Sequence, residues 1–364
     1  MEGPRTPRRD EFDPLIKFLD VGLSTQLTHP RSYSIREEYP TVLNPDNLFN
    51  MRIITDHGQI VSHAVTKSQI VKSPYLIYKV CTIGSVVTDP AFRRQGHSRS
   101  IINECLRSAH EQECDLAILW SDLHDFYERL GFTLAGTEIA VLIDHKVNLQ
   151  VPPSHVPTSI LNTSRVDPQA LLRLYNEHSV TTLRSPAQVE AYLKIPNSEI
   201  FTLWDQENIL QAYAIVGKGA DLVDHIHEWG GKVSAIMSLI KHIRDVRQRE
   251  LTLLVPQHAL NLLRHLKSSQ CPMHKGYLGL MKVTHPLQFV SKLQKLIGYF
   301  VKIEFHDENY ILTHGTQTKI LTEKDFLRLV FNPPLDQFSP QTPLEHMLLD
   351  LFPLPFWLWG WDSI

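Results

Sequence analysis

The sequence has little cysteine and no excess of charge of one sign. Four cysteines, Cys81, Cys105, Cys114 and Cys271, stand in apolar segments without a Cys-x-x-Cys pair. We therefore expect buried thiols in a reducing compartment, not a disulfide framework or a zinc site. The 36 basic and 39 acidic residues give a formal net charge of −3, which argues against a nucleic-acid partner bound through bulk charge.

Export and membrane signals are also lacking. The basic residues 1–9 have no apolar run behind them, so we expect a short disordered tail and a cytoplasmic protein. The most apolar stretch, residues 348–361, is too short to cross a bilayer and is interrupted by Asp350, Pro353 and Pro355. Its aromatic side chains would form a sticky patch in solvent, so we expect them to pack onto the protein. Apolar tails also form contacts between subunits, which leaves a homo-oligomer open.

What is present is an alternation of strand and helix periodicities. Strands are predicted at 51–55, 60–65, 75–87, 116–120 and 138–143, and helices at 12–21, from about 96 to 109 and at 123–130. A proline-rich stretch, 149–168, predicts a domain boundary. A similar order recurs up to residue 267, and a helix, a hairpin and a second helix follow from 286. We expect an α/β fold with mixed sheets and three domains, 1–148, 165–285 and 286–364.

The most informative segment runs from the third strand into the next helix. Gly84 inside this strand predicts a bulge or a close backbone approach. After the turn at Asp89-Pro90, the helix is expected to open at about Gly96. Its free N–H groups would form an anion site with the flanking side chains. The candidate residues of this site are Arg93, Arg94, Gln95, Gly96, His97, Ser98 and Arg99.

Two motifs in this order resemble the GCN5-related N-acetyltransferase (GNAT) superfamily. Arg93, Gly96 and Ser98 fill its R-x-x-G-x-(small) pyrophosphate loop, in which the last position is usually Gly or Ala. Residues 125–132 resemble its F/L-Y-x-x-x-G-F segment, with Tyr127 at the tyrosine position. The resemblance implies acetyl-CoA as the donor, bound through its diphosphate, and no metal.

The superfamily's chemistry gives further expectations. Main-chain groups of Val86, Val87 and Thr88 would pair with the pantetheine arm, and a splayed strand would offer an N–H to the thioester carbonyl. Tyr127 would be the general acid for the leaving thiolate. The general base stays open, and the candidates in the first domain are Glu37, Glu38, Asp122 and His124.

The layout is also similar to the enhanced-intracellular-survival family of aminoglycoside acetyltransferases, which have tandem GNAT halves and a third domain resembling a sterol carrier. The second half here has Gly230-Gly231 but no Arg-x-x-Gly loop, so it should wall the acceptor pocket. In that family the terminal carboxylate enters the active site, and the matching group is the α-carboxylate of Ile364. The third domain is shorter here and the final residues differ, so simple core packing of the tail is the alternative.

These features predict an N-acetyltransferase that moves an acetyl group from acetyl-CoA to a primary amine of a small molecule by direct attack. One alternative is a protein-lysine acetyltransferase, which would need an open groove for a lysine-containing peptide. Another is an acyl-CoA sensor that does not turn over. His225 and His227 share one face of a predicted strand, but two ligands are too few for zinc.

Overall fold

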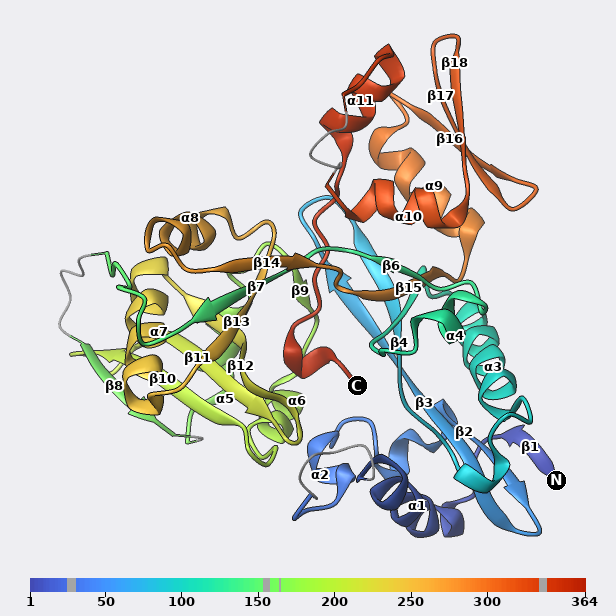
Figure 1. The fold of residues 1–364 in the computed structure, drawn as a ribbon, viewed down its shortest axis with the longest axis horizontal. Coiled ribbons are helices and arrows are strands. Elements are labelled where there is room, and N and C mark those ends of the chain that lie inside the picture. The colour runs from blue at the N-terminus through green and yellow to red at the C-terminus, as the bar shows by residue number, and fades with distance from the viewer. Residues whose placement is uncertain (25–30, 153–157, 164, 334–338) are drawn as a thin grey trace.

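Two large mixed sheets and one small antiparallel sheet organise the computed structural model, which describes residues 1–24, 31–152, 158–163, 165–333 and 339–364 (Figure 1). The strands and helices predicted between residues 12 and 143 are all present, with most ends close to the predicted ones. For example, the predicted hairpin at 51–65 forms, and its second strand continues to Lys72. All four cysteines are buried and free, as predicted.

The first sheet has eight strands. In spatial order they are β1 (Glu2–Arg5), β2 (Met51–Asp56), β3 (Gln59–Lys72), β4 (Ile77–Thr88), β5 (Leu116–Leu119), β15 (Gly279–Val283) and β6 (Thr133–Ala135), with β9 (Thr181–Thr182) beside β3. Helices α1 (Phe12–Ser24) and α3 (His97–Glu111) belong to separate apolar clusters with residues of this sheet. The short helices α2 (Ile35–Glu38) and α4 (His124–Glu128) lie near strand ends that border a cavity between the two large sheets.

The second sheet repeats this plan. Its strands, in spatial order, are β14 (Met273–Gly276), β7 (Glu138–Ile143), β13 (Leu251–Pro256), β12 (Asp221–Gly231), β11 (Leu210–Lys218), β10 (Glu199–Asp205) and β8 (Thr158–Asn162). Its helices are α5 (Pro168–Tyr175), α6 (Pro186–Tyr192), α7 (Val233–Arg247) and α8 (Leu260–Ser268). The recurrence predicted from the sequence is thus present as two sheets, each with a parallel pair joined through a helix, β4–α3–β5 and β12–α7–β13.

The two sheets exchange strands, and besides β7 and β15 the two-residue strand β9 of the second half pairs with β3 of the first sheet. Strand β7, from the first half of the chain, pairs with β13 and β14 of the second sheet. Strand β15, from the second half, pairs with β5 and β6 of the first sheet. Figure 1 shows the two crossing segments side by side between the sheets. The predicted domain ranges 1–148 and 165–285 therefore each contain a strand that completes the other sheet. That these two ranges are separate domains stays a prediction.

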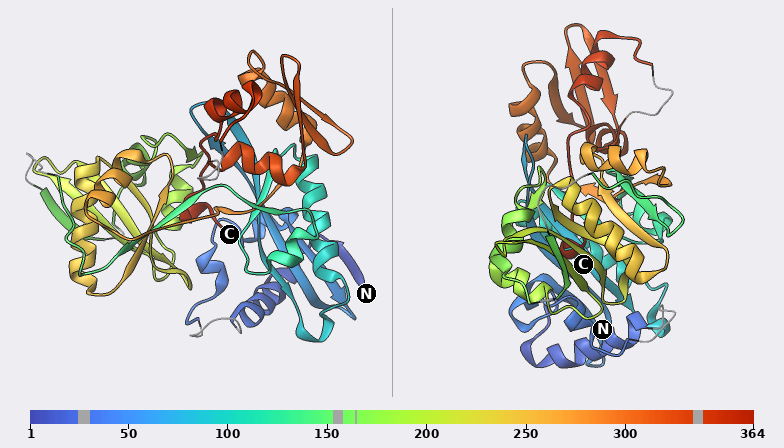
Figure 2. Two further views of the ribbon diagram at one scale, coloured as in Figure 1. Left: turned by 45° about the horizontal axis from the view of Figure 1, so that its top comes forward. Right: turned by 90° about the vertical axis from the view of Figure 1, so that its left-hand side faces the viewer.

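The third sheet is small. It consists of β16 (Lys302–His306), β17 (Asn309–His314) and β18 (Gln317–Leu321), with α9 (Pro286–Ile297), α10 (Glu323–Phe331) and α11 (Pro343–Leu351). From α11 the tail descends between the two large sheets, and the C-terminus lies in the middle of the molecule (Figures 1 and 2). Trp357, Trp359 and Trp361 are buried, which confirms that the aromatic tail packs onto the protein.

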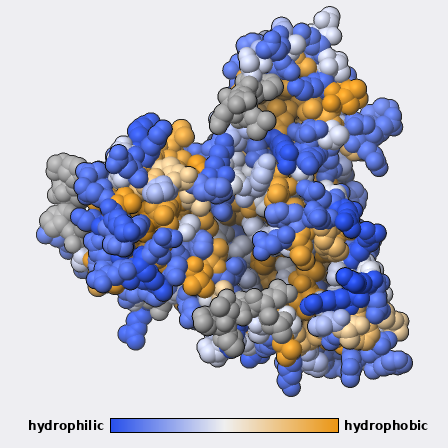
Figure 3. Space-filling view, in the orientation of Figure 1, coloured by the Kyte–Doolittle hydropathy of each residue, from blue (hydrophilic) through white to orange (hydrophobic). Residues whose placement is uncertain are grey.

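One expectation about the N-terminus is wrong. Residues 2–5 are not a disordered tail, because they form β1 against β2. Arg5 fixes the segment by binding both carboxylate oxygens of Glu11 at 2.7 Å. A polar edge strand has no apolar alternation, so its sequence gives no strand signal. No helix of the described residues is both long enough and apolar enough for a membrane span. On the face shown in Figure 3, hydrophilic residues separate the apolar patches.

Candidate active site

Strand β4 carries a bulge where the sequence predicted one. Its register against β3 shifts between Gly84 and Val87. Within the described pairs of these strands, Ser85 and Val86 have no partner residue. Ser85 adopts a φ of 48°, in the left-handed region that a non-glycine residue rarely occupies. On its other side β4 pairs with β5 only as far as Thr82. The two parallel strands therefore separate beside the bulge.

A buried histidine holds this bulge. Nδ1 of His63 on β3 lies 2.9 Å from the carbonyl oxygen of Ser85. Burial lowers the pKa of His63 to about 4, so the ring is neutral at neutral pH. Because a carbonyl oxygen can only accept, the proton of the neutral ring must be on Nδ1. Nε2 is buried and has no hydrogen-bond partner among the described residues.

A chain of hydroxyl groups links β3, β4 and α3. Ser62 donates to the carbonyl oxygen of Val87 at 3.0 Å, and its Oγ lies 2.7 Å from Oγ1 of Thr88. Thr88 Oγ1 lies in turn 2.8 Å from Oγ of Ser98, in the first turn of α3. Ser98, the position at which the sequence departs from Gly or Ala, thus ties the helix to the end of the bulged strand.

The predicted anion loop connects β4 to α3. Gly96, just before the helix, has a φ of 85°, and apart from its two chain neighbours no described residue has an atom within 4 Å of where its Cβ would be. Arg93 extends back along the strand end, with Nε 3.4 Å from the carbonyl oxygen of Thr88. The side chains of the loop are exposed at Arg93, Arg94, Gln95 and Arg99 and half-buried at His97 and Ser98. The structure therefore presents basic side chains and a helix N-terminus on one open surface.

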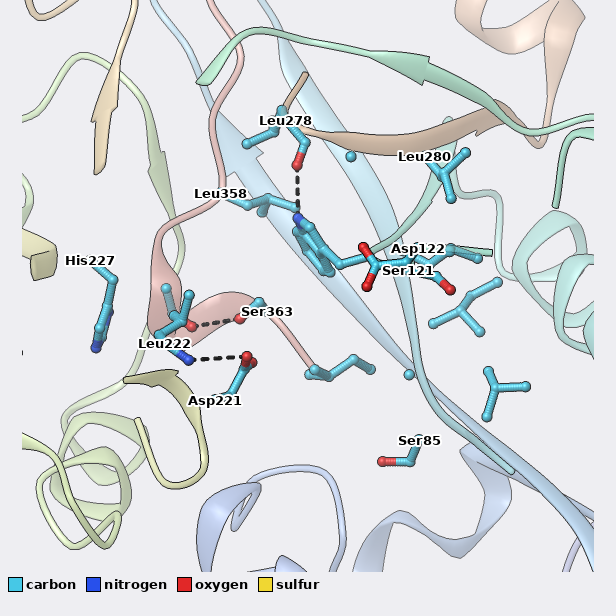
Figure 4. A pocket seen from close by; sticks show the side chains of 18 of the residues that line it. Ser85, Ser121, Asp122, Asp221, Leu222, His227, Leu278, Leu280, Leu358 and Ser363 are labelled. Atoms are coloured by element: carbon cyan, nitrogen blue, oxygen red, sulfur yellow. Dashed lines mark hydrogen bonds between the residues drawn. The ribbon is translucent and has the colours of Figure 1, made fainter. Parts of the chain in front are cut away.

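A cavity of about 950 Å³ lies beside the bulge, between the two large sheets (Figure 4). We call the first sheet with its helices the first unit and the second sheet with its helices the second unit. Figure 4 shows Ser121 and Asp122 of the first unit facing Asp221 of the second, with Ser363 of the tail between them. Further lining residues come from all these parts of the chain: Ser85, Val86, Leu119, Trp120, His124, Tyr127, Glu138, Leu222, His225, His227, Tyr277, Leu278, Leu358 and Ile364. A small molecule in this cavity would contact both sheets and the tail.

Tyr127 on α4 reaches the cavity from the core of the first sheet. Its ring packs edge-to-face against Phe126 and Phe132, and only 5% of the residue is exposed. Burial raises the pKa of Tyr127 to about 12. The phenol therefore keeps its proton at neutral pH.

The candidate bases divide into two groups. Asp122 and His124 line the cavity, whereas Glu37 and Glu38 are not among its described lining residues. Glu38 is fully buried and accepts from the backbone N–H groups of Ala220 and Asp221, both at 3.1 Å. It is also paired with Arg31. Glu38 thus serves to join the two sheets.

Sequence reasoning missed a further acid in the cavity, Glu138 at the start of β7. It is half-buried, and burial raises its pKa to about 7. The sequence gives little warning of it, because a glutamate before an apolar strand usually faces solvent. Glu138 lies in the space between the sheets because β7 pairs with β13 of the second sheet and not with a strand of the first.

The end of the tail lies against the bulge. A Cβ added to Gly84 would be 2.5 Å from both the backbone carbon and the oxygen of Ile364. The second prediction for Gly84, a close backbone approach, is therefore confirmed as well. Ile364 and Tyr127 both line the cavity, so the structure brings the two predicted catalytic residues to one space.

A buried network fixes the tail to the second unit. Arg184 donates to both carboxylate oxygens of Glu228, at 2.6 and 2.9 Å, and to both of Asp362, at 2.9 and 2.8 Å. Lys218 donates to the carbonyl oxygen of Ser363 at 2.7 Å, and burial lowers the pKa of Lys218 to about 8. These bonds set the position of the last residues of the tail.

The histidine pair has structural contacts. The Nε2 of His227 lies 2.9 Å from the carbonyl oxygen of Gly217, and burial lowers the pKa of His227 to about 3. Nδ1 of His225 lies 2.7 Å from the carbonyl oxygen of Val223. Over the described part of the chain, no group of three or more His, Cys, Asp or Glu residues is arranged to hold a metal ion.

The comparisons with known proteins agree with this geometry. A family model described as an acetyltransferase (GNAT) domain matches residues 4–135. No curated protein matches the sequence. A probable N-acyltransferase from Enterococcus faecalis is similar with a TM-score of 0.66 and 13% identity, over 96% of this chain and 97% of that chain.

Two more solved structures are similar over nearly their whole length. A GCN5-related N-acetyltransferase from Kribbella flavida has a TM-score of 0.64 and 10% identity, over 96% of this chain and 95% of that chain. Eis1 from Mycobacterium abscessus has a TM-score of 0.63 and 11% identity, over 96% and 97%. At these identities the likeness shows the fold, including its tandem layout, and leaves the acceptor undetermined.

Proposed function

Residues 4–135 form an acetyltransferase domain of the GNAT family, and from this premise we propose that the chain moves an acetyl group from acetyl-CoA to a primary amine by direct attack. The family makes the chain an acyltransferase. The observation that carries the proposal is the bulged end of β4, which lies beside both an exposed basic loop and a cavity of about 950 Å³. A donor binding site and an acceptor space thus meet at one strand end.

The residues present fit the donor. Among the described residues, strand β4 has no strand partner on the β5 side beyond Thr82, so its edge can pair with an extended amide-containing arm along Val86, Val87 and Thr88. The open surface at Gly96 leaves room for a diphosphate at the N-terminus of α3. Around it Arg93, Arg94 and Arg99 supply charge, and Gln95, His97 and Ser98 supply polar groups. Bound acetyl-CoA supplies the activated acyl group.

Tyr127 is the proposed general acid. It needs to hold its proton until the thiolate leaves, and its pKa of about 12 ensures that it does. Tyr127, on α4, lines the same cavity as Ser85 and Val86. Replacing Tyr127 with Phe keeps the ring packing and removes only the phenolic hydroxyl group.

For the general base we propose the α-carboxylate of Ile364, because the backbone of this residue lies directly against Gly84. Glu138 is a second candidate, favoured by its pKa of about 7, which lets a carboxylate accept a proton from an ammonium group more readily. Either group would take the proton of the acceptor amine before or as the amine attacks.

The acceptor we propose is a small molecule with a primary amine. Both sheets and the tail surround the cavity, and the carboxylates of Asp122, Glu138 and Asp221 line it, which favours a cation. A lysine-containing peptide would need an open groove instead. An acyl-CoA sensor that does not turn over is the other alternative, and it would have no use for an acid at Tyr127.

Other features of the chain enter the proposal through resemblance. The three-stranded sheet with α9, α10 and α11 would be a reduced sterol-carrier fold, and the ranges 1–148, 165–285 and 286–364 would be the three domains of the chain. Four free cysteines accord with the cytoplasm as the proposed location. Whether identical subunits associate is a matter for sedimentation of the purified protein.

The test is release of free thiol from acetyl-CoA with and without a panel of amines. We expect amine-dependent release that falls at least about tenfold in Tyr127→Phe, the lower range for loss of an acid–base group. Tight acetyl-CoA binding without release for any amine would favour the sensor. Turnover of lysine peptides in preference to every small amine would favour the protein-lysine alternative.

A pH profile separates the two bases. If Glu138 is the base, kcat/KM rises with pH up to about 7, where the carboxyl group loses its proton, and Glu138→Gln removes that dependence. If the carboxylate of Ile364 is the base, deletion of residue 364 abolishes turnover and Glu138→Gln keeps most of it. Intact mass of the purified protein must first show a chain that ends at Ile364.

A further inference from the structure

We propose that His63 is a positioning residue that aims the backbone N–H of Val86 at the thioester carbonyl of the donor. The inference rests on the proposed function, since it needs a thioester at the end of β4. It assigns to this buried side chain a role in orienting the peptide that joins Ser85 to Val86. To fill this buried position of β3, an apolar side chain of similar size would be enough.

The geometry of a peptide bond carries the first step. The carbonyl oxygen of Ser85 and the N–H of Val86 belong to one trans peptide plane and point in opposite directions. His63 binds the carbonyl oxygen from the β3 side, with Nδ1 at 2.9 Å. The N–H of Val86 is therefore directed away from the His63 ring, and both Ser85 and Val86 line the cavity that begins where β4 and β5 separate.

The bulge makes such a constraint necessary. The register of β3 and β4 gives neither Ser85 nor Val86 a partner residue, so the regular pairing of the two strands is interrupted at this peptide. Ser85 also adopts a φ of 48°, which a serine does not favour without support. The bond from His63 supplies that support, and it polarises the same peptide so that its N–H becomes a better donor.

The state of the ring supports the assignment. Burial keeps His63 neutral, and the proton must be on Nδ1 to be donated to Ser85. Nε2 has no partner among the described residues although it is buried. A histidine kept at the cost of one unsatisfied nitrogen indicates that the bond made by the other nitrogen matters.

Two substitutions of equal polarity separate the two ring nitrogens. The amide nitrogen of Asn occupies the position of Nδ1, whereas that of Gln reaches the position of Nε2. His63→Asn should therefore keep the bond to Ser85, and His63→Gln should lose it. Ser62→Ala is the matched control, because it removes a neighbouring bond to the carbonyl oxygen of Val87 and leaves His63 in place.

The binding experiment uses two CoA analogues that cannot transfer an acyl group. In one, a methylene replaces the thioester sulfur and the carbonyl remains; the other is S-ethyl-CoA, which has no carbonyl. By calorimetry we expect the wild-type protein, His63→Asn and Ser62→Ala to bind the ketone about fivefold more tightly than S-ethyl-CoA, as one hydrogen bond allows. His63→Gln should bind the two equally. In turnover, kcat should fall at least tenfold in His63→Gln and be largely kept in His63→Asn.

Several results would overturn the proposal. One is an unchanged preference for the ketone in His63→Gln, and another is the same loss in Asn and Gln. A third needs no variant: side-chain ¹⁵N shifts of the wild-type protein should show the neutral Nδ1–H tautomer of His63, and an Nε2–H tautomer would refute the assignment even if His63→Gln fails to fold. A wild-type protein that binds and acetylates but shows no preference for the ketone sinks only this inference. A wild-type protein that binds no CoA analogue contradicts the proposed function as well.

Discussion

The two large sheets share one plan, yet they differ in what occupies the gap beside their central strands. In the first, β4 and β5 separate after Thr82 and a cavity begins there. In the second, the parallel pairing of β12 and β13 ends at Ile226. There Nε1 of Trp229 donates to the carbonyl oxygen of Leu254 at 3.1 Å, and Trp359 of the tail packs edge-to-face on the indole. The second gap is thus filled by the protein itself.

The connections into the two helices differ in the same way. Helices α3 and α7 both have 15 residues. Residues 89–96 lead into α3, whereas only Lys232 separates β12 from α7. The second unit therefore has no room for a phosphate-binding loop. The difference agrees with the proposed binding of the donor through the loop and the open gap of the first unit, whereas the buried charges of the second unit hold the tail in place.

The largest effect is expected when a charge of the second unit is removed. Arg184→Met would leave the buried carboxylates of Glu228 and Asp362 facing each other without a cation. We expect the free energy of unfolding to fall by about 3–5 kcal/mol, as for other broken buried ion pairs. Chemical denaturation measures this, and acetyl-CoA affinity of the protein that remains folded should be unchanged.

The control for Arg184 is a surface arginine of the first unit. Arg107 forms exposed ion pairs with Glu104 and Glu111, so Arg107→Met should change stability little. A variant at Arg184 that is as stable as the wild type would contradict the assigned role of the network. Its stabilising effect would then have to come from elsewhere in the tail.

The next effect concerns the basic loop of the first unit. The double variant Arg93→Ala with Arg94→Ala should bind acetyl-CoA roughly 100-fold more weakly, since each charge-assisted hydrogen bond contributes about 1.5–3 kcal/mol. The matched change in the second unit, Lys232→Ala, should leave affinity as it is. Calorimetry on both variants decides; equal affinities would mean that the donor binds without the loop.

Much of this comparison could be predicted from the sequence, because its signals are local. The loop at Arg93–Ser98, the bulge at Gly84 and the repeated order of elements all depend on residues close together in the chain. The exchange of β7 and β15 could not be predicted. The apolar pattern of β7 fits either sheet equally well, and only the tertiary pairing with β13 decides.

A third prediction concerns the indole of Trp229, which fills the gap beside β12 and β13. Trp229→Phe keeps an aromatic ring but leaves the carbonyl oxygen of Leu254 without its donor. We expect a loss of about 1–3 kcal/mol in the free energy of unfolding. Trp204→Phe, which removes an indole bond to Thr202 in the half-buried part of β10, should cost less.

The same Trp229 variant tests whether the second unit can bind acetyl-CoA once its gap is opened. Its acetyl-CoA stoichiometry should stay at one per chain, because an opened gap without a loop still lacks phosphate donors. Binding of a second equivalent would show that the indole alone keeps the second unit from holding the donor. Calorimetric stoichiometry against the wild type distinguishes these outcomes.

The site was only partly predictable for a physical reason. Tyr127 and the loop lie in one compact motif region, and the sequence identified them as candidates. Glu138 and the partners of Arg184 come together from distant segments, and nothing local distinguishes them from solvated charges. His63 has the pattern of an ordinary strand residue, and only the register shift at the bulge reveals its contact.

The smallest effect is expected at Ser98, where the sequence departs from the usual Gly or Ala. Ser98→Ala removes the contact to Thr88, while Thr88 keeps its contact to Ser62. Because only one hydroxyl contact is lost at a partly solvated position, acetyl-CoA affinity should fall about two- to fivefold, which corresponds to about 0.5–1 kcal/mol. Ser100→Ala, an exposed change on the same helix, should have no effect. A double variant with Thr88→Val should lose no more than Thr88→Val alone, since both changes break the same contact. Tighter binding by Ser98→Ala would instead show that the hydroxyl crowds the diphosphate, and the link from β3 to α3 would then have no part in holding the loop.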